Sequence, residues 1–138
     1  MIVPRFESMK VGDEIPALKI PPVSRHTLAL YCGSSGDHNP IHVDLDYAKS
    51  AGLDDVIAHG MLSAGYLARM ITDWVPQSTI RRINNRFTAM THIGDSVTCT
   101  GRVVEKFENG DEKLVRLEMQ THTPEAQTII AEAVIALE

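Results

Sequence analysis

The stretch that decides the fold is AHGMLSAGYLARMITDWVP, residues 58–76. Between Met61 and Trp74, apolar side chains fall on nearly every side of a helix with 3.6 residues per turn: Met61, Leu62, Tyr66, Leu67, Met70, Ile71 and Trp74. Because a helix that is apolar all round is a buried one, we expect a central helix that Pro76 ends, with Tyr66 and Trp74 in the core. Small side chains would let another backbone approach it closely: Ser63, Ala64, Gly65 and Ala68.

The last third of the chain has the period of β-strands. Residues 97–103 and 115–119 alternate apolar and polar side chains, as in strands with one buried face. Asn109-Gly110 lies between them and can adopt the positive φ angles of a tight hairpin turn. Residues 79–90 and 128–138 predict two further strands of the same antiparallel sheet.

The first third predicts one edge strand and one helix. The run EIPALKI, residues 14–20, precedes Pro21-Pro22, where proline removes backbone donors, so it is expected at a sheet edge. Ser24 is expected to cap a helix that Gly33 stops, and residues 44–52 predict a short helical piece. Together the elements predict an α+β fold, a single domain over residues 1–138, with a sheet of about five strands packed on one long helix.

Composition excludes several classes of function. The net charge of −5, with no long basic cluster, argues against a nucleic-acid binder. Cys32 and Cys99 form no C-x-x-C pair, so neither a disulfide framework nor a cysteine zinc site is indicated, and a reducing compartment is expected. The N-terminus lacks a signal-peptide pattern and no apolar run reaches the length of a membrane span, which favours a cytoplasmic location and no membrane partner.

The most chemically dense stretch is GDHNPIH, residues 36–42. A polar turn explains Asp37, Asn39 and Pro40, because Asp and Asn bond nearby amides and proline fixes φ. It does not explain His42. Since Asn39 precedes proline and is pushed out of the helical region, we expect Asp37 and His42 at the two ends of a stiff, nearly extended loop, flanking one water molecule. Histidine, with an ordinary pKa of about 6.5, exchanges protons near neutral pH, and an aspartate beside it can orient it.

A metal site is the alternative for these residues. His38, His42, His59, Asp37 and Asp44 offer imidazole and carboxylate ligands, but no H-x-x-x-H or H-E-x-x-H spacing is present. The scattered spacing disfavours a metal. The other histidines, at positions 26, 92 and 122, are isolated and are interpreted as surface or structural residues.

Further candidates lie at and after the start of the long helix. The Gly60 amide opens that helix and could hold an anionic oxygen, or Gly60 could simply let the chain turn. Ser63, one turn later, could offer a hydroxyl to a site, or bond its own helix or fill a narrow space. The arginines at positions 81, 82 and 86 could meet the phosphates of a carrier group, or lie on a solvated face.

These motifs together resemble a known family. The run from Tyr31 to His42, with Ala48 after it, resembles the hydratase-2 motif of the MaoC-like (R)-specific enoyl-CoA hydratases. AHGMLSAG, NRFTAM and the later Gly-Asp are similar to the rest of that family's pattern, and the resemblance extends over residues 8–138. The same segments are also similar to the catalytic subunits of (R)-3-hydroxyacyl-acyl-carrier-protein dehydratases.

The resemblance implies a hot-dog fold, in which the sheet wraps the long helix and two subunits pair, as a homodimer or higher oligomer or as a heterodimer with another hot-dog subunit. It implies interconversion of trans-2-enoyl and (R)-3-hydroxyacyl thioesters carried on CoA or acyl-carrier protein, with no metal or redox cofactor. Asp37 and His42 would be catalytic, the Gly60 amide would hold the thioester oxygen, and Asn39 would support the loop; Ser63, from its position one turn after Gly60, is kept as a substrate-binding candidate.

Two departures and one alternative remain open. Ser34 stands where many members carry an aliphatic residue, and Ala68 stands where some hydratases have a serine, which puts an assisting hydroxyl in doubt. The alternative is a hot-dog subunit that binds acyl thioesters without turnover. The presence of both Asp37 and His42 argues against it, and the sequence leaves the acyl chain length open.

Overall fold

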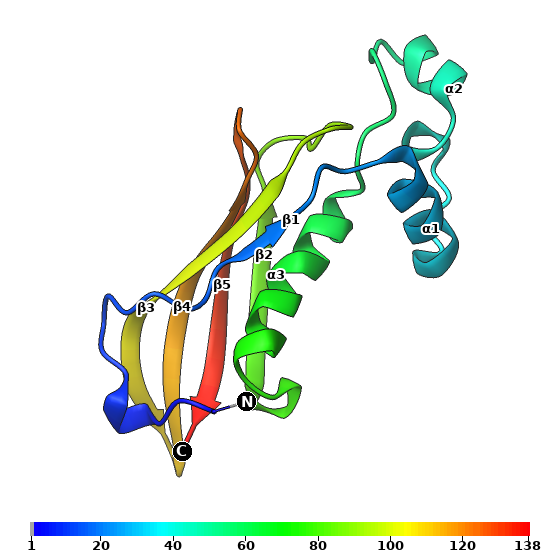
Figure 1. Cartoon of the computed structure of the whole chain (residues 1–138). Coiled ribbons are helices and arrows are strands. Elements are labelled where there is room, and N and C mark those ends of the chain that lie inside the picture. Colours follow the sequence, from blue (N-terminus) through cyan, green and yellow to red (C-terminus); the bar gives the residue numbers. More distant parts are fainter. Residues whose placement is uncertain (1) are drawn as a thin grey trace.

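The computed structural model describes residues 2–138, in which one antiparallel sheet curves along a long helix (Figure 1). The strands lie in the order β1-β3-β4-β5-β2. Their bounds are Leu18–Ile20 (β1), Ile80–Phe87 (β2), Val97–Asn109 (β3), Glu112–His122 (β4) and Gln127–Leu137 (β5). The predicted α+β class and the antiparallel sheet are therefore confirmed.

The long helix, α3, spans Gly60–Trp74 and packs one side against the sheet. Leu67 and Ile71 are fully buried there, and Tyr66 and Trp74 pack partly buried against the same core, as predicted. The expectation of burial all round is wrong for this chain, because Met61 is 58% exposed. The sheet covers only one side of the helix, so the periodicity overstated its burial.

The alternation in the last third is confirmed. Val97, Cys99 and Val103 of β3 are buried and face the core, while Arg102 between them is exposed. Gly101 also faces inward, and a Cβ at this position would lie 3.1 Å from Ile15 Cδ1. That distance is tighter than ordinary van der Waals contact, so the missing side chain makes room for Ile15 from the N-terminal segment.

Local signals placed several element ends incorrectly. The helix α1, Arg25–Ser35, begins at the Ser24 cap as predicted but runs through Gly33 and ends at Gly36, whose φ is 76°. The left-handed conformation that stops a helix is taken by Gly36, so Gly33 remains helical. In the β3–β4 hairpin, Gly110 takes a φ of 60° while Asn109 pairs with Glu112 in the ladder. Only the glycine of the predicted pair has a positive φ.

The predicted strands at both ends of the sheet are also shorter in the structure. β1 covers Leu18–Ile20 rather than residues 14–20, because Pro16 has no N–H to give to the ladder; Glu14 forms only an isolated bridge with Arg102. β2 ends at Phe87 rather than at residue 90.

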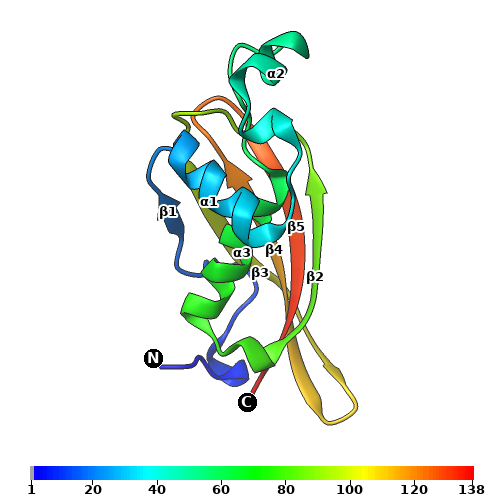
Figure 2. The ribbon, with the colours of Figure 1, turned by 90° about the vertical axis from the view of Figure 1, so that its right-hand side faces the viewer.

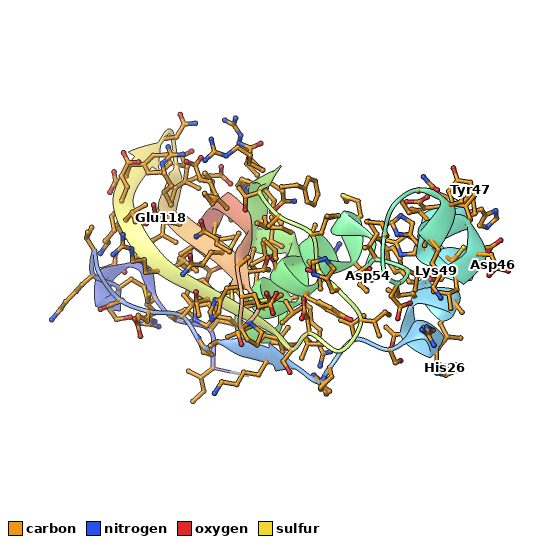
Figure 3. All side chains as sticks on the ribbon, turned by 90° about the horizontal axis from the view of Figure 1, so that it is seen from above. His26, Asp46, Tyr47, Lys49, Asp54 and Glu118 are labelled. Carbon is orange, nitrogen blue, oxygen red and sulfur yellow. The ribbon has the colours of Figure 1, made fainter. Side chains whose placement is uncertain are left out.

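The helices α1 and α2 (Leu45–Ser50) form a projection beyond the N-terminal end of α3 (Figures 1 and 2). Seen from above, His26, Asp46, Tyr47 and Lys49 lie on the outer part of this projection, away from the sheet (Figure 3). Short 3-10 turns complete the fold: Phe6–Ser8, Pro40–His42 and Gln77–Thr79. Among the described residues, no helix is long and apolar enough to cross a membrane.

Candidate active site

The loop between α1 and α2 brings Asp37 and His42 together. Asp37 Oδ1 accepts a hydrogen bond from the Asn39 amide at 3.3 Å, and Asn39 Oδ1 accepts one from the Ile41 amide at 3.1 Å. These two bonds fix the carboxylate and start the 3-10 turn Pro40–His42, with proline at its first position. Asp37 Oδ2 then lies 4.0 Å from His42 Nε2.

The geometry corrects the predicted shape of this loop. Asn39 is extended, with ψ of 121°, as expected before proline, but the chain turns immediately afterwards. In a fully extended chain the Cα atoms of Asp37 and His42 would be roughly 16 Å apart, too far for their side chains to meet as they do here. The 3-10 turn folds the chain back and lets Asp37 Oδ2 and His42 Nε2 lie 4.0 Å apart, so the pair lies side by side rather than at two ends of a loop.

His42 is held in one orientation by the segment before α3. Its Nδ1 lies 2.7 Å from the carbonyl oxygen of Ile57, an acceptor, so Nδ1 carries the hydrogen and donates it. In the neutral ring, Nε2 therefore presents a lone pair toward Asp37. A water oxygen about 2.8 Å from both Nε2 and Oδ2 would see them at an angle of about 90°, near the angle between the two hydrogens of water. One water can thus donate a hydrogen to each group.

A cavity of about 610 Å³ opens beside this pair. His42, Gly60 and Ser63 all line it, so the structure brings three of the predicted site residues to one space. The rest of the wall comes from the end of β2 and the connection after it, from the β4–β5 connection and the start of β5, and from the segment before α3: Phe87, Thr88, Ala89, Met90, Thr91, His92, Thr123, Glu125, Ala126, Thr128, Ile129, Ile57 and Ala58.

Gly60 begins α3, so its amide has no carbonyl of a preceding turn to bond and is free for a ligand. A Cβ at Gly60 would lie 2.9 Å from Phe87 Cε1, which means that the Phe87 ring packs directly over the glycine. Gly60 is therefore needed for this close approach, and not only to turn the chain.

Ser63 is 3% exposed, and its hydroxyl forms no hydrogen bond within residues 2–138, its own helix included. The interpretation that it bonds its own helix is wrong, and the hydroxyl is available to a ligand in the cavity. Ala68 lies elsewhere, in a groove with Thr72 and Ile83, so its lack of a hydroxyl does not bear on the cavity.

The metal alternative fits the geometry poorly. Ligand atoms of Asp37, His42 and His59 lie within 4.8 Å of one another. However, the two imidazole rings are stacked, with centroids 3.8 Å apart and planes at 22°, so their in-plane lone pairs run side by side rather than converging. His59 Nε2 is also 3.2 Å from the Asp37 carbonyl oxygen and donates to it. Of these three residues, only Asp37 and His42 therefore remain as ligands that could converge on a metal ion.

Other sequence candidates lie away from the pair. His38 is exposed. The arginines at positions 81, 82 and 86, considered above as ligands for the phosphates of a carrier group, do not line the cavity, and Arg81 is paired with Glu112 at 2.6 Å. His92, interpreted as an isolated surface residue, does line it. Ser34 lies in the last turn of α1, where its hydroxyl bonds the Tyr31 carbonyl.

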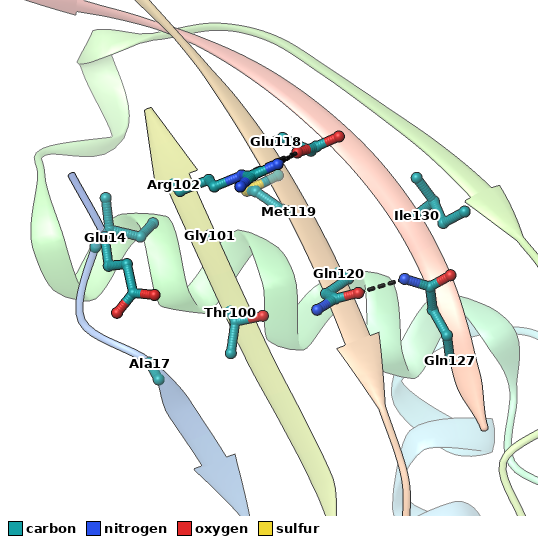
Figure 4. Close-up of a pocket in the computed structure, with 11 residues that line it drawn as sticks. Glu14, Ala17, Thr100, Gly101, Arg102, Glu118, Met119, Gln120, Gln127 and Ile130 are labelled. Atoms are coloured by element: carbon teal, nitrogen blue, oxygen red, sulfur yellow. Dashed lines mark hydrogen bonds and ion pairs between the residues drawn. The ribbon is translucent and has the colours of Figure 1, made fainter. Parts of the chain in front are cut away.

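A second hollow lies on the face of the sheet turned away from α3 (Figure 4). It measures about 510 Å³, and its side chains already pair with one another: Arg102 with Glu118, and Gln127 with Gln120. No histidine lines it, and neither Asp37 nor Gly60 borders it. Of these two hollows, the cavity beside His42 is thus the one lined by histidine and by the Gly60 start of α3.

Sequence reasoning assigned no role to two residues of the site. Phe87 belongs to the NRFTAM segment, but its contact with Gly60 joins residues far apart in the chain. The sequence offers His59 as a metal ligand and as part of the stretch that opens the long helix, and its position immediately before Gly60 is the signal that places it near the site. Its contacts with Asp37 and His42 depend on how the loop folds back onto the start of α3.

Comparison with known proteins agrees with this fold. Residues 8–124 match the MaoC like domain family. The chain is 37% identical over 112 residues to an (R)-specific enoyl-CoA hydratase of Rhodospirillum rubrum, which covers 77% of this chain and 76% of that protein. It is 29% identical over 89 residues to a mitochondrial 3-hydroxyacyl-[acyl-carrier-protein] dehydratase of Arabidopsis thaliana, covering 64% of this chain and 52% of that protein.

Among solved structures, the R-hydratase PhaJ1 from Pseudomonas aeruginosa in its unliganded form is similar, with a TM-score of 0.84 and 27% identity. The similarity covers 97% of this chain and 86% of that one. The hot-dog fold implied by the sequence motifs is therefore confirmed. With a family match over residues 8–124 and a relative 37% identical along most of its length, the chain belongs to the MaoC-like domain family.

Proposed function

We propose that this protein is an (R)-specific hydratase that interconverts trans-2-enoyl-CoA and (R)-3-hydroxyacyl-CoA thioesters. The observation that carries the proposal is the pairing of His42 Nε2 with Asp37 Oδ2 at 4.0 Å, beside a cavity that the Gly60 amide also borders. The activity named for the Rhodospirillum rubrum relative supports the same reaction.

The proposed hydration step uses this geometry. A water held by Asp37 and His42 attacks the β-carbon of the enoyl thioester and gives a proton to His42 Nε2. Electrons of the double bond move toward the thioester oxygen, and the Gly60 amide stabilises the resulting enolate oxygen. A proton is then returned to the α-carbon from the same side. Each step is a proton transfer or an addition, so the proposal includes no metal and no redox cofactor.

The test is to follow the loss of enoyl absorbance with short and medium trans-2-enoyl-CoA substrates. We expect Asp37→Asn and His42→Ala each to lower kcat by ~10² to 10⁴-fold, the usual contribution of acid-base groups. His38→Ala and Asp46→Asn are matched controls, because both residues are exposed and neither lines the cavity. Near wild-type turnover in both site variants would refute the assignment, and thioester binding without hydration by the wild type would favour a non-catalytic subunit.

A dehydratase acting on acyl-carrier-protein substrates is the second candidate, supported by the similarity to the Arabidopsis thaliana dehydratase. The two candidates share the site chemistry and differ in the carrier. A carrier protein would need a basic surface near the cavity, but the arginines at positions 81, 82 and 86 do not border the cavity beside His42. Competition between matched acyl-CoA and acyl-carrier-protein substrates separates the two, and we expect preference for CoA.

We also infer that the working unit is a dimer that pairs the β2 strands of two copies. β2 runs for eight residues from Ile80 to Phe87, pairs with β5 and, within residues 2–138, lies at the edge of the sheet. A long edge without proline favours pairing with another strand. Exposed apolar side chains lie at the end of β2, after it and on the projection, where a second copy could cover them: Phe87, Met90, Leu30, Val43 and Tyr47.

Successive residues of a strand point their amides to opposite sides, which provides a matched test of this pairing. Asn84→Pro and Asn85→Pro are therefore compared, because Asn84 and Asn85 are neighbours in β2. One of these two substitutions removes an amide that faces the open edge of the sheet and is called the open-edge variant; the other removes an amide bonded to β5. We expect wild-type protein to have twice the 15.2 kDa chain mass in solution, and the open-edge variant to stay folded as a monomer. A wild-type monomer that is active would contradict the dimer.

A further inference from the structure

His59 joins the parts of the site that the proposed reaction uses. It directly precedes Gly60 at the start of α3, its Nε2 lies 3.2 Å from the Asp37 carbonyl oxygen, and its ring stacks on that of His42. The stacked centroids are 3.8 Å apart with an interplanar angle of 22°. The His59 side chain therefore contacts both Asp37 and His42, the two residues proposed to hold the water, and it lies directly before Gly60, whose amide is proposed to hold the thioester oxygen.

The surroundings of His59 leave it little freedom. It is 1% exposed, and the Tyr31 ring from α1 packs edge-on against it with centroids 4.8 Å apart. The imidazole is thus enclosed by aromatic rings from two segments, Tyr31 on one and His42 on the other. Such close contacts fix the ring plane, and through the stacking they fix the plane of His42 as well.

A purely structural role explains His59 poorly. Its Nδ1 is buried with no hydrogen-bond partner among the described residues, which is unfavourable for a polar atom. An apolar ring of similar size would fill the same space without that penalty. The feature that distinguishes histidine here is the Nε2–H bond to the Asp37 carbonyl oxygen.

The ring is suited to position its neighbours without competing for the proton. Burial, the largest effect, and the nearby His42 lower the pKa of His59, although the bond to the Asp37 carbonyl acts in the opposite direction. Protonation would also place a second N–H at Nδ1, which has no hydrogen-bond partner among residues 2–138. The titratable groups packed against it are Tyr31 from α1, and Asp37 and His42 from the loop.

We propose that His59 is a positioning residue of the hydration reaction: as a neutral ring, it clamps the Asp37 backbone by its hydrogen bond and the His42 imidazole by stacking. This inference rests on the proposed function for its kinetic consequence. Its geometric part, a fixed His42 ring and a neutral His59, stands independently of the substrate.

The test compares three variants. His59→Phe keeps a stacked ring and removes the hydrogen bond, while His59→Gln restores a donor near the position of Nε2 without the ring. His122→Phe is the matched control, because His122 also has a buried Nδ1 without a partner among the described residues but lies in β4, outside the cavity lining. Kinetics with trans-2-enoyl-CoA, kcat against pH and thermal unfolding are measured for each.

We expect His59→Phe to lower kcat about 10- to 100-fold with KM changed less than about threefold, because a misplacement of about 1 Å costs up to that much. The variant should remain as stable as the wild type, and His59→Gln should recover part of kcat. Unchanged kcat in His59→Phe, or an equal loss in His122→Phe, would overturn the inference. A loss confined to KM would overturn it as well.

A second measurement separates this inference from the proposed function. Long-range proton–nitrogen spectra of the imidazoles report their tautomers without any substrate. We expect His59 to stay neutral with its hydrogen on Nε2 near neutral pH, and the His42 nitrogen signals to shift in His59→Phe but not in His122→Phe. A His59 that is charged at neutral pH, or His42 signals unmoved by His59→Phe, would refute the positioning role even in an active enzyme. Normal signals in a wild type without hydration activity would refute only the reaction.

Discussion

Replacing Gly60 by alanine tests how closely the cavity wall packs against the start of α3. The new Cβ would lie 2.9 Å from Phe87 Cε1 and 3.0 Å from Cδ1, whereas ordinary contact begins at 3.4 Å. The ring must therefore retreat by about half an ångström or swing away. Because Phe87 is 50% exposed and borders the cavity, we expect the ring to move rather than the backbone.

The expected effect on stability is small. Overpacking costs about 1–3 kcal/mol in a rigid core, but the half-exposed ring places this site at the low end of that range. Alanine in place of glycine in a helix contributes up to about 1 kcal/mol in the opposite direction. We therefore expect the free energy of unfolding of Gly60→Ala, measured by urea titration, to change by less than about 1 kcal/mol.

The expected effect on activity is larger, because the displaced ring alters the space in which, in the proposed reaction, the Gly60 amide would meet the thioester oxygen. We expect kcat/KM for enoyl-CoA hydration to fall about 10- to 100-fold, which corresponds to about 1.4–2.7 kcal/mol of transition-state stabilisation. Phe87→Ala supplies the second arm of a double-mutant cycle. If the clash is the cause, Gly60→Ala should cost much less in the Phe87→Ala background. Full activity in Gly60→Ala, or an equal loss in both backgrounds, would refute the reasoning.

Further predictions concern the core and two buried titratable groups. Leu67→Ala, in the buried centre of α3, should lower the free energy of unfolding by about 2–5 kcal/mol in a urea titration, whereas the exposed Arg69→Ala on the same helix should change it by about 0.5 kcal/mol or less. Burial raises the pKa of the Cys99 thiol to about 12, so the thiol should not react with iodoacetamide in native protein at pH 8.5. Mass spectrometry should find Cys99 unmodified in the native protein and modified after unfolding, and rapid labelling of the native protein would contradict this. Burial lowers the pKa of His59, so the unfolded state binds this proton first as the pH falls below 6.5, and stability is lost in that range. In unfolding titrations, protonation of His59 should add at most about 1.4 kcal/mol per pH unit to the decrease of the free energy of unfolding with falling pH. His59→Phe should remove this contribution, and parallel pH profiles of the wild type and the variant would contradict it.

Short stretches of sequence predicted several of the residues that the structure brings together at the candidate site. GDHNPIH identified Asp37 and His42 because the turn left His42 unexplained, and the structure brings the two to 4.0 Å. The same stretch misled about shape, since the preference of Asn39 for an extended backbone is a property of one residue, while the 3-10 turn after it depends on the Asn39 cap and on Pro40 together. The end of α1 was misplaced for a similar reason, because the local sequence does not indicate whether Gly33 or Gly36 takes the positive φ that stops the helix.

Sequence patterns were sufficient to predict which helices and strands form and the alternating burial of β3, because hydrophobic period, caps and turn residues act over a few positions along the chain. Only the tertiary structure decided what meets across the site: Phe87 over Gly60, the Ile57 carbonyl that orients His42, and His59 between Tyr31 and His42. These contacts depend on how a loop, a helix start and an edge strand pack against one another. No local periodicity encodes such distances, and the closeness of ring, amide and carboxylate follows from packing alone.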